Sequence, residues 1–440
     1  MSVFFGTDGL RGKIGQDLNH DIAFKCGNSL SQLMGKGKVV IGRDTRISGS
    51  YLLSSLASGL MAGGVDVYDA GILPTSAISY LTKFHGFDYG IIITASHNPS
   101  EYNGIKIISA TGEKISDEQE EEIERGFIKT KIVDFSNLGR YYLDNSLVSK
   151  YVNYIVSTAS ICLCGMKIVI DSSNGASYRV APKILERLGA KVYKTNCRND
   201  GKNINNNCGS LYPQNLIKKV KRENADFGVA FDGDADRIIV VSDSGEIIDG
   251  DMIITALAKF YKEQGTLENN VVVGTSQTNM GIEQDLKEQG ITLERADVGD
   301  KYVIALMNKY KASLGGEQSG HVIIKRFLPT GDGILTAVQL ACACRHKNLS
   351  ISKLCTVTLF PQTNINVEVK DKLRVLGSES LAIAISNVKQ ELAGLGRVLV
   401  RASGTEPKIR IMVEGEKKEV TESLANYLAG LVKSLEQKGE

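Results

Sequence analysis

Three aspartates spaced two apart are the residues of this sequence best suited to metal chemistry. Asp232, Asp234 and Asp236 directly follow a short apolar stretch, in the motif Phe-Asp-Gly-Asp-Ala-Asp-Arg. Alternating carboxylates in a tight turn can converge on one hard cation, and three of them leave room for water and a phosphate oxygen, which suits Mg²⁺. The alternative is a solvated acidic hairpin turn. An EF-hand is excluded, because Arg237 stands where that loop needs glycine and Asp243 where it needs glutamate.

A serine in a second polar loop is the candidate nucleophile. Ser96 lies in Thr-Ala-Ser-His-Asn-Pro, next to His97, and Lys106 follows in Asn-Gly-Ile-Lys. A loop serine is often part of a turn, but a serine beside a Mg²⁺ site can carry a phosphoryl group. A Ser-His-Asp triad stays open, although the chain has no Gly-x-Ser-x-Gly elbow. We take Ser96, His97, Lys106 and Arg237 as candidate catalytic residues, with His97 and Lys106 as candidates for proton transfer and charge stabilisation.

A third polar segment, Arg-Ala-Ser-Gly-Thr-Glu-Pro, has the donors of an anion-binding loop. It offers the hydroxyls of Ser403 and Thr405, backbone amides around Gly404, and the guanidinium groups of Arg401 and Arg410. Backbone amides and arginine forks bind phosphate without the help of a helix. The alternative is a hairpin with surface arginines.

Two further motifs supply candidate substrate-binding residues. Glu317 and Ser319, in Gly-Gly-Glu-Gln-Ser-Gly-His, could hold vicinal hydroxyls of a sugar, since a carboxylate accepts two hydroxyl hydrogen bonds or one from an ammonium group. His321 ends the same motif, and we include it among the candidate substrate-binding residues. Arg11, in Phe-Gly-Thr-Asp-Gly-Leu-Arg-Gly, is expected either to reach a phosphate or to cap a loop.

An internal repeat predicts how these loops are positioned. Three segments share one layout: a short apolar strand, a turn of small residues, a helical stretch, and a return through glycine into another strand, which is the βαβ pattern. The first strands are expected at 38–42, 167–171 and 271–274. A further strand follows in each copy, at 89–93, 227–231 and 312–315, and each of these ends in one of the polar loops. Because ligands gather at the carboxyl ends of strands in open α/β sheets, we expect the three loops to face a common cleft. The alternative is three ordinary surface turns.

The C-terminal part of the chain follows a different pattern. Residues 398–401 and 408–414 are predicted strands, the second with polar/apolar alternation, and a helix with leucines at helical spacing follows. The predicted fold class is therefore α/β, with three repeated mixed-sheet α/β domains and a smaller C-terminal α+β domain around one central cleft. We expect the phosphoserine loop in domain 1–155, the metal loop in 156–253, the sugar-binding loop in 254–366 and the phosphate-binding loop in 367–440.

Composition excludes several classes of protein. The chain has 440 residues, 42% hydrophobic and 23% charged, so intrinsic disorder is not its main state. Lys and Arg number 52 against 50 Asp and Glu, a balance that argues against a large nucleic-acid footprint. The long uncharged stretch 47–65 holds five serines and four glycines. It is too polar to span a membrane and is expected to form a buried or amphipathic helix.

The cysteines and the N-terminus point to a reducing compartment. Eight cysteines are scattered without a C-x-x-C motif or clustered histidines, so we expect no zinc site and reduced, mostly buried thiols. The first residues show no secretory signal, and the expected location is the cytoplasm. The expected partner is a small sugar phosphate, with no nucleic acid and no membrane, and a homodimer is left open.

Taken together, the motifs resemble those of the α-D-phosphohexomutases. They follow the family's order over nearly the whole chain, at 5–12, 94–99, 103–106, 231–237, 298–303, 315–321 and 401–407. The resemblance implies four domains around one deep cleft, the first three sharing a topology. Two positions depart from the family pattern: Lys301 stands where arginine is usual, and Arg401 where methionine or a similar residue is usual.

The resemblance also implies a mechanism. Ser96 would be the phosphoserine, and one Mg²⁺ per subunit would bind Asp232, Asp234, Asp236 and an oxygen of the Ser96 phosphate. Glu317 and Ser319 would hold the sugar, and the 401–410 loop the non-reacting phosphate. A hexosamine bisphosphate would serve as intermediate or primer.

Within the family, one residue bears on the choice of sugar. Gln318 favours the branch that acts on glucosamine phosphates, for the amino-sugar precursors of the bacterial cell wall, over the gluco- and mannomutases, which usually have methionine there. A gluco- or mannomutase is the alternative within the family. A Mg²⁺-dependent sugar phosphatase or phosphotransferase and a non-catalytic sugar-phosphate-binding protein are the rivals from other classes.

Overall fold

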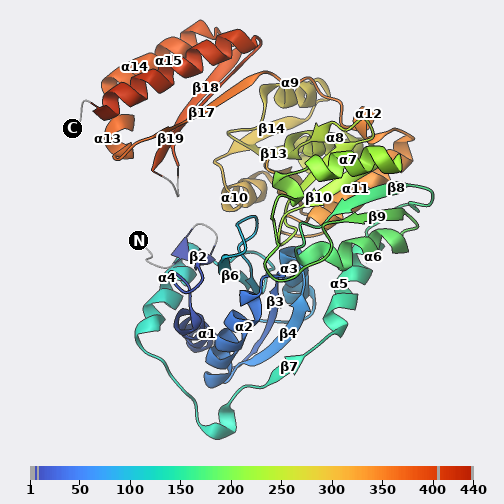
Figure 1. Ribbon diagram of the computed structural model, residues 1–440, viewed down its shortest axis with the longest axis vertical. Helices are drawn as coiled ribbons and strands as arrows, with labels where there is room; N and C mark the ends of the chain where they lie inside the picture. The colour runs from blue at the N-terminus through green and yellow to red at the C-terminus, as the bar shows by residue number, and fades with distance from the viewer. Residues whose placement is uncertain (1–4, 7–8, 404–406, 438–440) are drawn as a thin grey trace. The chain divides into compact units, whose positions relative to one another are not determined.

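Four β-sheets organise the chain in the computed structural model, which describes residues 5–6, 9–403 and 407–437 (Figure 1). The described chain divides into two units. The first comprises residues up to 277 together with 291–356, and the second comprises 278–290 together with 357–440. The first unit contains three of the sheets and the second unit the fourth.

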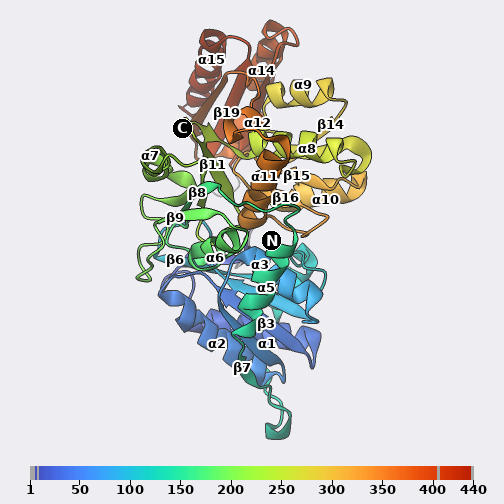
Figure 2. The ribbon, with the colours of Figure 1, turned by 90° about the vertical axis from the view of Figure 1, so that its right-hand side faces the viewer.

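The first sheet has seven strands in the order β1-β2-β6-β5-β3-β4-β7. Its core lies between the sheet and the two N-terminal helices, and the next helix packs against the opposite face, beside α5 (Figure 2). The strands are β1 Phe5–Gly6, β2 Gly9–Lys13, β3 Lys38–Arg43, β4 Asp66–Ile72, β5 Tyr89–Ile93, β6 Tyr102–Ser109 and β7 Tyr141–Leu143. The helices are α1 His20–Met34, α2 Ser48–Ala62, α3 Thr75–Phe84, α4 Asp117–Arg125 and α5 Ser146–Ser157. Helix α2, with Leu52, Leu56 and Leu60 fully buried, confirms the helix expected within 47–65.

The second and third sheets repeat the central part of the first. Their orders are β12-β11-β10-β8-β9 and β16-β15-β13-β14, against β6-β5-β3-β4 in the first sheet. The second contains β8 Lys167–Asp171, α6 Val180–Arg187, β9 Lys191–Thr195, α7 Gln214–Glu223, β10 Phe227–Phe231, β11 Ile238–Ser242 and β12 Ile247–Ile248. The third is formed by β13 Val271–Thr275, β14 Thr292–Ala296, β15 Leu314–Gly316 and β16 Val322–Ile324. The helices around it in the first unit are α8 Gly250–Glu263, α10 Asp300–Tyr310, α11 Gly333–Lys347 and α12 Ile351–Leu354.

Each repeat places one hairpin in the same position. Strands β5, β10 and β15 run parallel to the first strand of their repeat and then turn back into the antiparallel strands β6, β11 and β16. The three polar loops predicted from the sequence are the tips of these hairpins. The predicted fold class of three mixed sheets and a smaller C-terminal domain is therefore confirmed, whereas the boundaries near residues 155, 253 and 367 stay predictions.

The second unit has one antiparallel sheet in the order β17-β19-β18. Helices α14 and α15 lie side by side on this sheet and enclose a core of small and aliphatic side chains (Figure 1). Its elements are α9 Met280–Glu288, β17 Gln362–Glu368, α13 Lys372–Leu376, α14 Glu379–Glu391, β18 Gly396–Ala402, β19 Lys408–Gly415 and α15 Lys418–Gln437. The short segment with α9 belongs here because Asn279 bonds to both backbone groups of Phe360 and Glu414 accepts from the amide of Met280.

The expectation of reduced, mostly buried cysteines is partly confirmed. Cys162 and Cys164 form a disulfide, so the expectation of reduced thiols throughout is wrong for this pair. A single residue separates the two cysteines, in an irregular segment where their Cα atoms are 5.4 Å apart, which brings the sulfurs within bonding reach. Five of the other six cysteines are buried, as expected.

None of the helices in the described part of the chain combines the length and the apolar composition of a membrane span.

Candidate active site

The loop between β5 and β6 presents Ser96. The side chain is buried, with 2% of the residue exposed, and its Oγ donates a hydrogen bond of 2.6 Å to Oδ2 of Asp232. Its backbone has φ of 50°, in the left-handed region that residues other than glycine seldom adopt. The structure thus brings the predicted nucleophile against the first of the three predicted metal ligands, 136 residues away in the sequence.

The loop between β10 and β11 brings the three carboxylates together. Asp232, Asp234 and Asp236 are all buried, and each offers one oxygen within 4.8 Å of the other two. Oδ1 of Asp232 accepts from the backbone amide of Arg237 at 3.2 Å. Gly233 lies so close to the Ser96 loop that an added Cβ would overlap the Ser96 carbonyl oxygen. Glycine at this position therefore lets the two loops meet.

Two cations face the carboxylates. Lys106, on β6, places Nζ 3.3 Å from Oδ2 of Asp234 and 3.8 Å from Oδ2 of Asp236. Arg237, at the end of the acidic loop, has an Nη1 atom 3.1 Å from Nδ1 of His97. Since a guanidinium can only donate, Nδ1 of His97 accepts this bond.

The proton of the Ser96 hydroxyl is therefore directed to Asp232 and not to His97. Nδ1 of His97 is 3.2 Å from Ser96 Oγ, but it already accepts from Arg237. Burial, together with the positive charges of Arg237 and Arg11, lowers the pKa of His97 to about 4, so the imidazole is neutral near pH 7. Nδ1 of His97 is therefore not placed to take that proton, and the proton-transfer role of Lys106 stays a prediction.

Burial and mutual repulsion shift the pKa values of the three carboxyl groups. Burial, and then the neighbouring charges of Asp236 and Asp234, raises the pKa of Asp232 well above its usual value. Burial and the charge of Asp234 likewise raise the pKa of Asp236. Burial also disfavours the charged form of Asp234, but Lys106 and the hydroxyl of Thr75 outweigh it, and the pKa of this carboxyl lies below its usual range. Excess negative charge in a buried cluster is the arrangement that a bound cation relieves.

The donor set fits a hard divalent cation. Oδ1 of Asp234 and Oδ1 of Asp236 are buried and have no hydrogen-bond partner among the described residues. In the described part of the chain this group consists of three carboxylates without a nitrogen or sulfur ligand, an oxygen site of the kind that Mg²⁺ prefers. The buried triad is thus a candidate metal site, as the sequence predicted.

The third hairpin loop reaches the same cluster. His321 is buried, and its Nδ1 lies 3.7 Å from Oδ2 of Asp236. Glu317 accepts a 2.8 Å hydrogen bond from the amide of Gly299 and a 3.1 Å bond from the hydroxyl of Ser319. Burial lowers the pKa of Arg237, but the negative charges of Asp236 and Asp232, and then that of Glu317, outweigh burial and raise it. The three polar loops of the first unit therefore meet, as expected.

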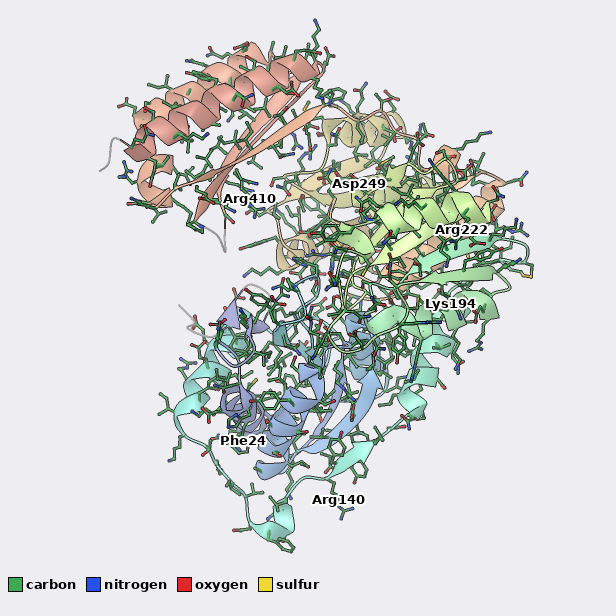
Figure 3. The ribbon with its side chains drawn as sticks, viewed as in Figure 1. Phe24, Arg140, Lys194, Arg222, Asp249 and Arg410 are labelled. Atoms are coloured by element: carbon green, nitrogen blue, oxygen red, sulfur yellow. A yellow bond between two sulfur atoms is a disulfide. The ribbon has the colours of Figure 1, made fainter. Side chains whose placement is uncertain are left out.

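The predicted anion-binding loop lies in the second unit. Arg401 on β18 and Arg410 on β19 are directly opposite each other across the antiparallel pair (Figure 3 labels Arg410). Ser403 is buried, and its amide donates to the carbonyl of Lys408 at 2.8 Å. Like charges directly opposite on neighbouring strands destabilise a sheet, and a bound anion would relieve that cost. Gly404 and Thr405, also predicted here, lie outside the described residues.

Comparison with known proteins matches this chain to one family over almost its full length. Models of the family described as phosphoglucomutase/phosphomannomutase match alpha/beta/alpha domain I at residues 2–132, domain II at 148–245, domain III at 249–359 and the C-terminal domain at 365–431.

The chain belongs to the phosphoglucomutase/phosphomannomutase family.

Relatives within the family are similar from end to end. Proteins named phosphoglucosamine mutase from Caldicellulosiruptor bescii and Alkaliphilus oremlandii are 44% and 42% identical, covering 99% and 98% of this chain and 99% of each relative. A crystal structure of a family member from Burkholderia thailandensis has a TM-score of 0.83 at 25% identity, covering 99% of this chain and 97% of that one. The N-acetylphosphoglucosamine mutase of Aspergillus fumigatus shares the fold, with a TM-score of 0.67 at 16% identity over 99% and 96% of the two chains.

The predicted family and enzyme class are thereby confirmed: the chain is a mutase, an isomerase that moves a phosphoryl group. One side chain of this site was missed by the sequence analysis. Thr75, at the start of α3, donates from its hydroxyl to Oδ2 of Asp234 at 2.6 Å. It lies 159 residues from its partner and forms no motif with it, so the sequence carries no signal for this contact.

Proposed function

We propose that this phosphohexomutase interconverts glucosamine 6-phosphate and glucosamine 1-phosphate, through a phosphoserine at Ser96 and a hexosamine bisphosphate intermediate. The observation that carries the phosphoserine proposal is the buried hydroxyl of Ser96, held 2.6 Å from a carboxylate of the three-aspartate cluster. The choice of sugar is supported by full-length relatives at 42–44% identity that are named phosphoglucosamine mutase.

The reaction consists of two phosphoryl transfers. In the first, the bond between phosphorus and Ser96 Oγ breaks while a bond forms to O1 of the 6-phosphate sugar, whose hydroxyl proton leaves. The bisphosphate then reorients, and Ser96 Oγ attacks its 6-phosphate. The bond between phosphorus and O6 breaks, O6 takes up a proton, and glucosamine 1-phosphate leaves with Ser96 phosphorylated again. Lys106 and Arg237 place positive charge beside the transferring group, and Lys106 is the proposed proton-transfer residue. Burial of Ser96 keeps bulk water from the phosphoserine.

We assign Mg²⁺ to the carboxylate cluster, one ion per subunit. Asp232, Asp234 and Asp236 would hold it, together with an oxygen of the Ser96 phosphate. When bound, it supplies positive charge that stabilises the transferring phosphoryl group.

The remaining predicted residues are assigned to the substrate. Glu317 has the charge to accept from the ammonium group of glucosamine, with Ser319 beside it and His321 and Arg11 near the metal ligands. Gln318, on which the sequence-based choice of sugar rests, accepts through its backbone carbonyl from the amide of Gly250 at 3.0 Å.

The second unit is assigned the phosphate that does not react. A bisphosphate must bind in two orientations, so the pocket for that phosphate has to be general for anions. Arg401, Ser403 and Arg410, with Gly404 and Thr405, offer such donors. We also propose that four domains, with boundaries near 155, 253 and 367, divide these tasks.

Turnover of three sugar phosphates tests the proposal. Glucosamine 6-phosphate, glucose 6-phosphate and mannose 6-phosphate are compared at equal concentration, each primed with a hexose bisphosphate and supplied with Mg²⁺. We expect the highest kcat/KM for glucosamine 6-phosphate. A higher value for glucose or mannose 6-phosphate would contradict the substrate assignment, and release of inorganic phosphate without isomerisation would contradict the mutase reaction in this chain.

A further inference from the structure

One arginine outside the assigned site directs four of its five side-chain donors to the Ser96 loop. Arg46 follows β3, in the turn Arg-Asp-Thr-Arg of the first repeat, and its side chain is completely buried. Nη2 donates to the carbonyls of Ser96 at 3.1 Å and Asn98 at 2.8 Å. Nη1 donates to the carbonyls of Pro99 and of Tyr102, the latter at 3.0 Å.

The fifth donor of this guanidinium goes to a buried carboxylate. Nε of Arg46 donates to Oδ2 of Asp44 at 2.9 Å, and the backbone amide of Arg46 donates to Oδ1 of Asp44 at 2.9 Å. A guanidinium has five N–H donors in a planar fork, and all five are used here. Four of them end on backbone carbonyls between residues 96 and 102. The side chain therefore fixes the backbone of the whole loop and does not bind a single neighbouring residue.

Asp44 also reaches the other side of Ser96. Its Oδ2 accepts from the hydroxyl of Thr94 at 2.7 Å, and that hydroxyl accepts from the backbone amide of Ser96 at 2.9 Å. Both backbone groups of Ser96 are therefore fixed by the same ion pair, the amide through Thr94 and Asp44 and the carbonyl through Arg46.

These contacts hold a backbone conformation that Ser96 would not adopt alone. Its φ of 50° lies in the left-handed region, which is unfavourable for a residue with a Cβ and persists where the surroundings determine it. The same φ sets the direction of the side chain, whose Oγ meets Asp232. Asn205, from the second repeat, adds a donor to the carbonyls of Ser96 and Asn98, at 2.8 and 3.0 Å.

We propose that Arg46 is a positioning residue for phosphoryl transfer: its buried guanidinium, oriented by Asp44, holds Ser96 in the left-handed conformation that aims Oγ at the metal-ligand cluster. The inference rests on the proposed role of Ser96 as phosphoryl carrier. Arg46 touches no reacting atom and acts through the backbone of the loop. Its loss should therefore lower kcat and leave the binding of the sugar phosphate largely intact.

The decisive variant is Arg46→Lys. Lysine keeps the charge that compensates Asp44 but has three donors on one nitrogen and cannot form the planar fork. Because a displacement of about 1 Å of a reacting group can cost about a hundredfold in rate, we expect kcat to fall by about that factor, with KM changed less than about threefold. Arg43→Lys is the matched control, since Arg43 begins the same turn and pairs with Asp69, away from the loop. It should leave kcat unchanged.

A second pair of variants keeps the test valid if Arg46→Lys does not fold. Thr94→Val has nearly the same shape but lacks the hydroxyl that links Asp44 to the Ser96 amide, whereas Thr94→Ser keeps it. We expect Thr94→Val to lose at least about tenfold in kcat and Thr94→Ser to recover most of it. A role confined to stability would lower the melting temperature of Thr94→Val without separating kcat from KM.

The outcomes separate this inference from the proposed function. All variants are measured on whichever sugar phosphate the wild-type protein turns over best, so an error in the sugar does not affect the comparison. If Ser96→Ala is inactive while Arg46→Lys or Thr94→Val keeps wild-type kcat, the positioning role is overturned and the phosphoserine stands. If Ser96→Ala keeps full activity, the phosphoserine mechanism itself fails.

Discussion

The Ser96 loop and the Asp232 loop occupy the same position in two repeats of identical strand order, yet they are held in different ways. The carbonyls of the Ser96 loop accept from side chains of other segments, those of Arg46 and Asn205. The Asp232 loop is held by backbone amides: those of Ala176, Thr75 and Gly333, from three other segments, donate to the carbonyls of Gly233, Asp234 and Ala235. Within the loop, the amides of Ala235 and Arg237 donate to Asp232.

This difference matches the work of each loop. In the proposed mechanism Ser96 gains and loses a phosphoryl group, so its side chain must stay available while its backbone is fixed by other residues. The aspartates are proposed to present constant charge, and backbone amides that bind the carbonyls of the loop hold the three carboxylates in place. One repeated scaffold thus carries two kinds of chemistry, because the tip of the hairpin can be changed without changing the sheet.

Removing the hydroxyl of Ser96 is the change with the largest expected effect. Ser96→Ala should lower mutase kcat by at least about 10⁴-fold, since Ser96 Oγ is the proposed carrier of the phosphoryl group. The assay is conversion of glucosamine 6-phosphate to glucosamine 1-phosphate in the presence of bisphosphate. Melting temperature and Mg²⁺ binding should stay close to wild type, and a variant with normal turnover would remove Ser96 from the mechanism.

Removing one charge from the acidic loop is expected to have the next largest effect. Asp234→Asn should weaken Mg²⁺ binding and lower kcat by about a thousandfold, or about 4 kcal/mol, because one of three converging charges is lost. Calorimetric Mg²⁺ titration and steady-state kinetics measure both effects. Asp226→Asn, before the opposite end of β10, is the control and should change neither. Unchanged Mg²⁺ dependence in Asp234→Asn would mean that the loop is only a turn.

The second unit contrasts with both loops, because its proposed role is binding and not transfer. Arg410→Ala should raise KM for the 1-phosphate and the 6-phosphate sugar by similar factors, about thirtyfold or about 2 kcal/mol. Phosphorylation of Ser96 and metal binding should survive. Arg374→Ala, in the same unit, changes an exposed contact with Glu436 and serves as the control. An effect on one isomer alone would show that the loop recognises the sugar and not only its phosphate.

The smallest expected effect sharpens the account of the Asp232 loop. Thr75→Val removes the hydroxyl that donates to Asp234 but keeps the shape of the side chain. Mg²⁺ affinity should fall by about tenfold, as is usual when a group that orients a metal ligand is lost. Thr75→Ser keeps the hydroxyl and should restore it. Equal affinities for the two variants would indicate that the carboxylate is oriented by its own loop alone.

The sequence predicted those parts of the molecule in which a pattern recurs. Strands β5 and β10 have the predicted bounds, because each is an apolar run closed by a polar loop. The same-position loops then followed from the repeat, and so did the meeting of Ser96 with the aspartates.

Other parts leave no such pattern. Strand β17 was not anticipated, since most of its side chains are half-buried or exposed and Val367 is its buried residue. The role of Arg46 was equally hidden, because its partners are backbone carbonyls, which any sequence provides. The disulfide between Cys162 and Cys164 depends on the local path of the chain, which two cysteines in a sequence do not define.

The most direct test of the central claim follows the phosphoryl group itself. Protein phosphorylated by a hexose bisphosphate is freed of excess reagent, mixed with glucosamine 6-phosphate and Mg²⁺, quenched within one turnover, and mapped by peptide mass spectrometry. We predict that the phosphate lies on Ser96 before mixing, and that its loss from that peptide matches the appearance of glucosamine bisphosphate. Phosphate on another residue, or loss from Ser96 as inorganic phosphate with no bisphosphate formed, would contradict the account.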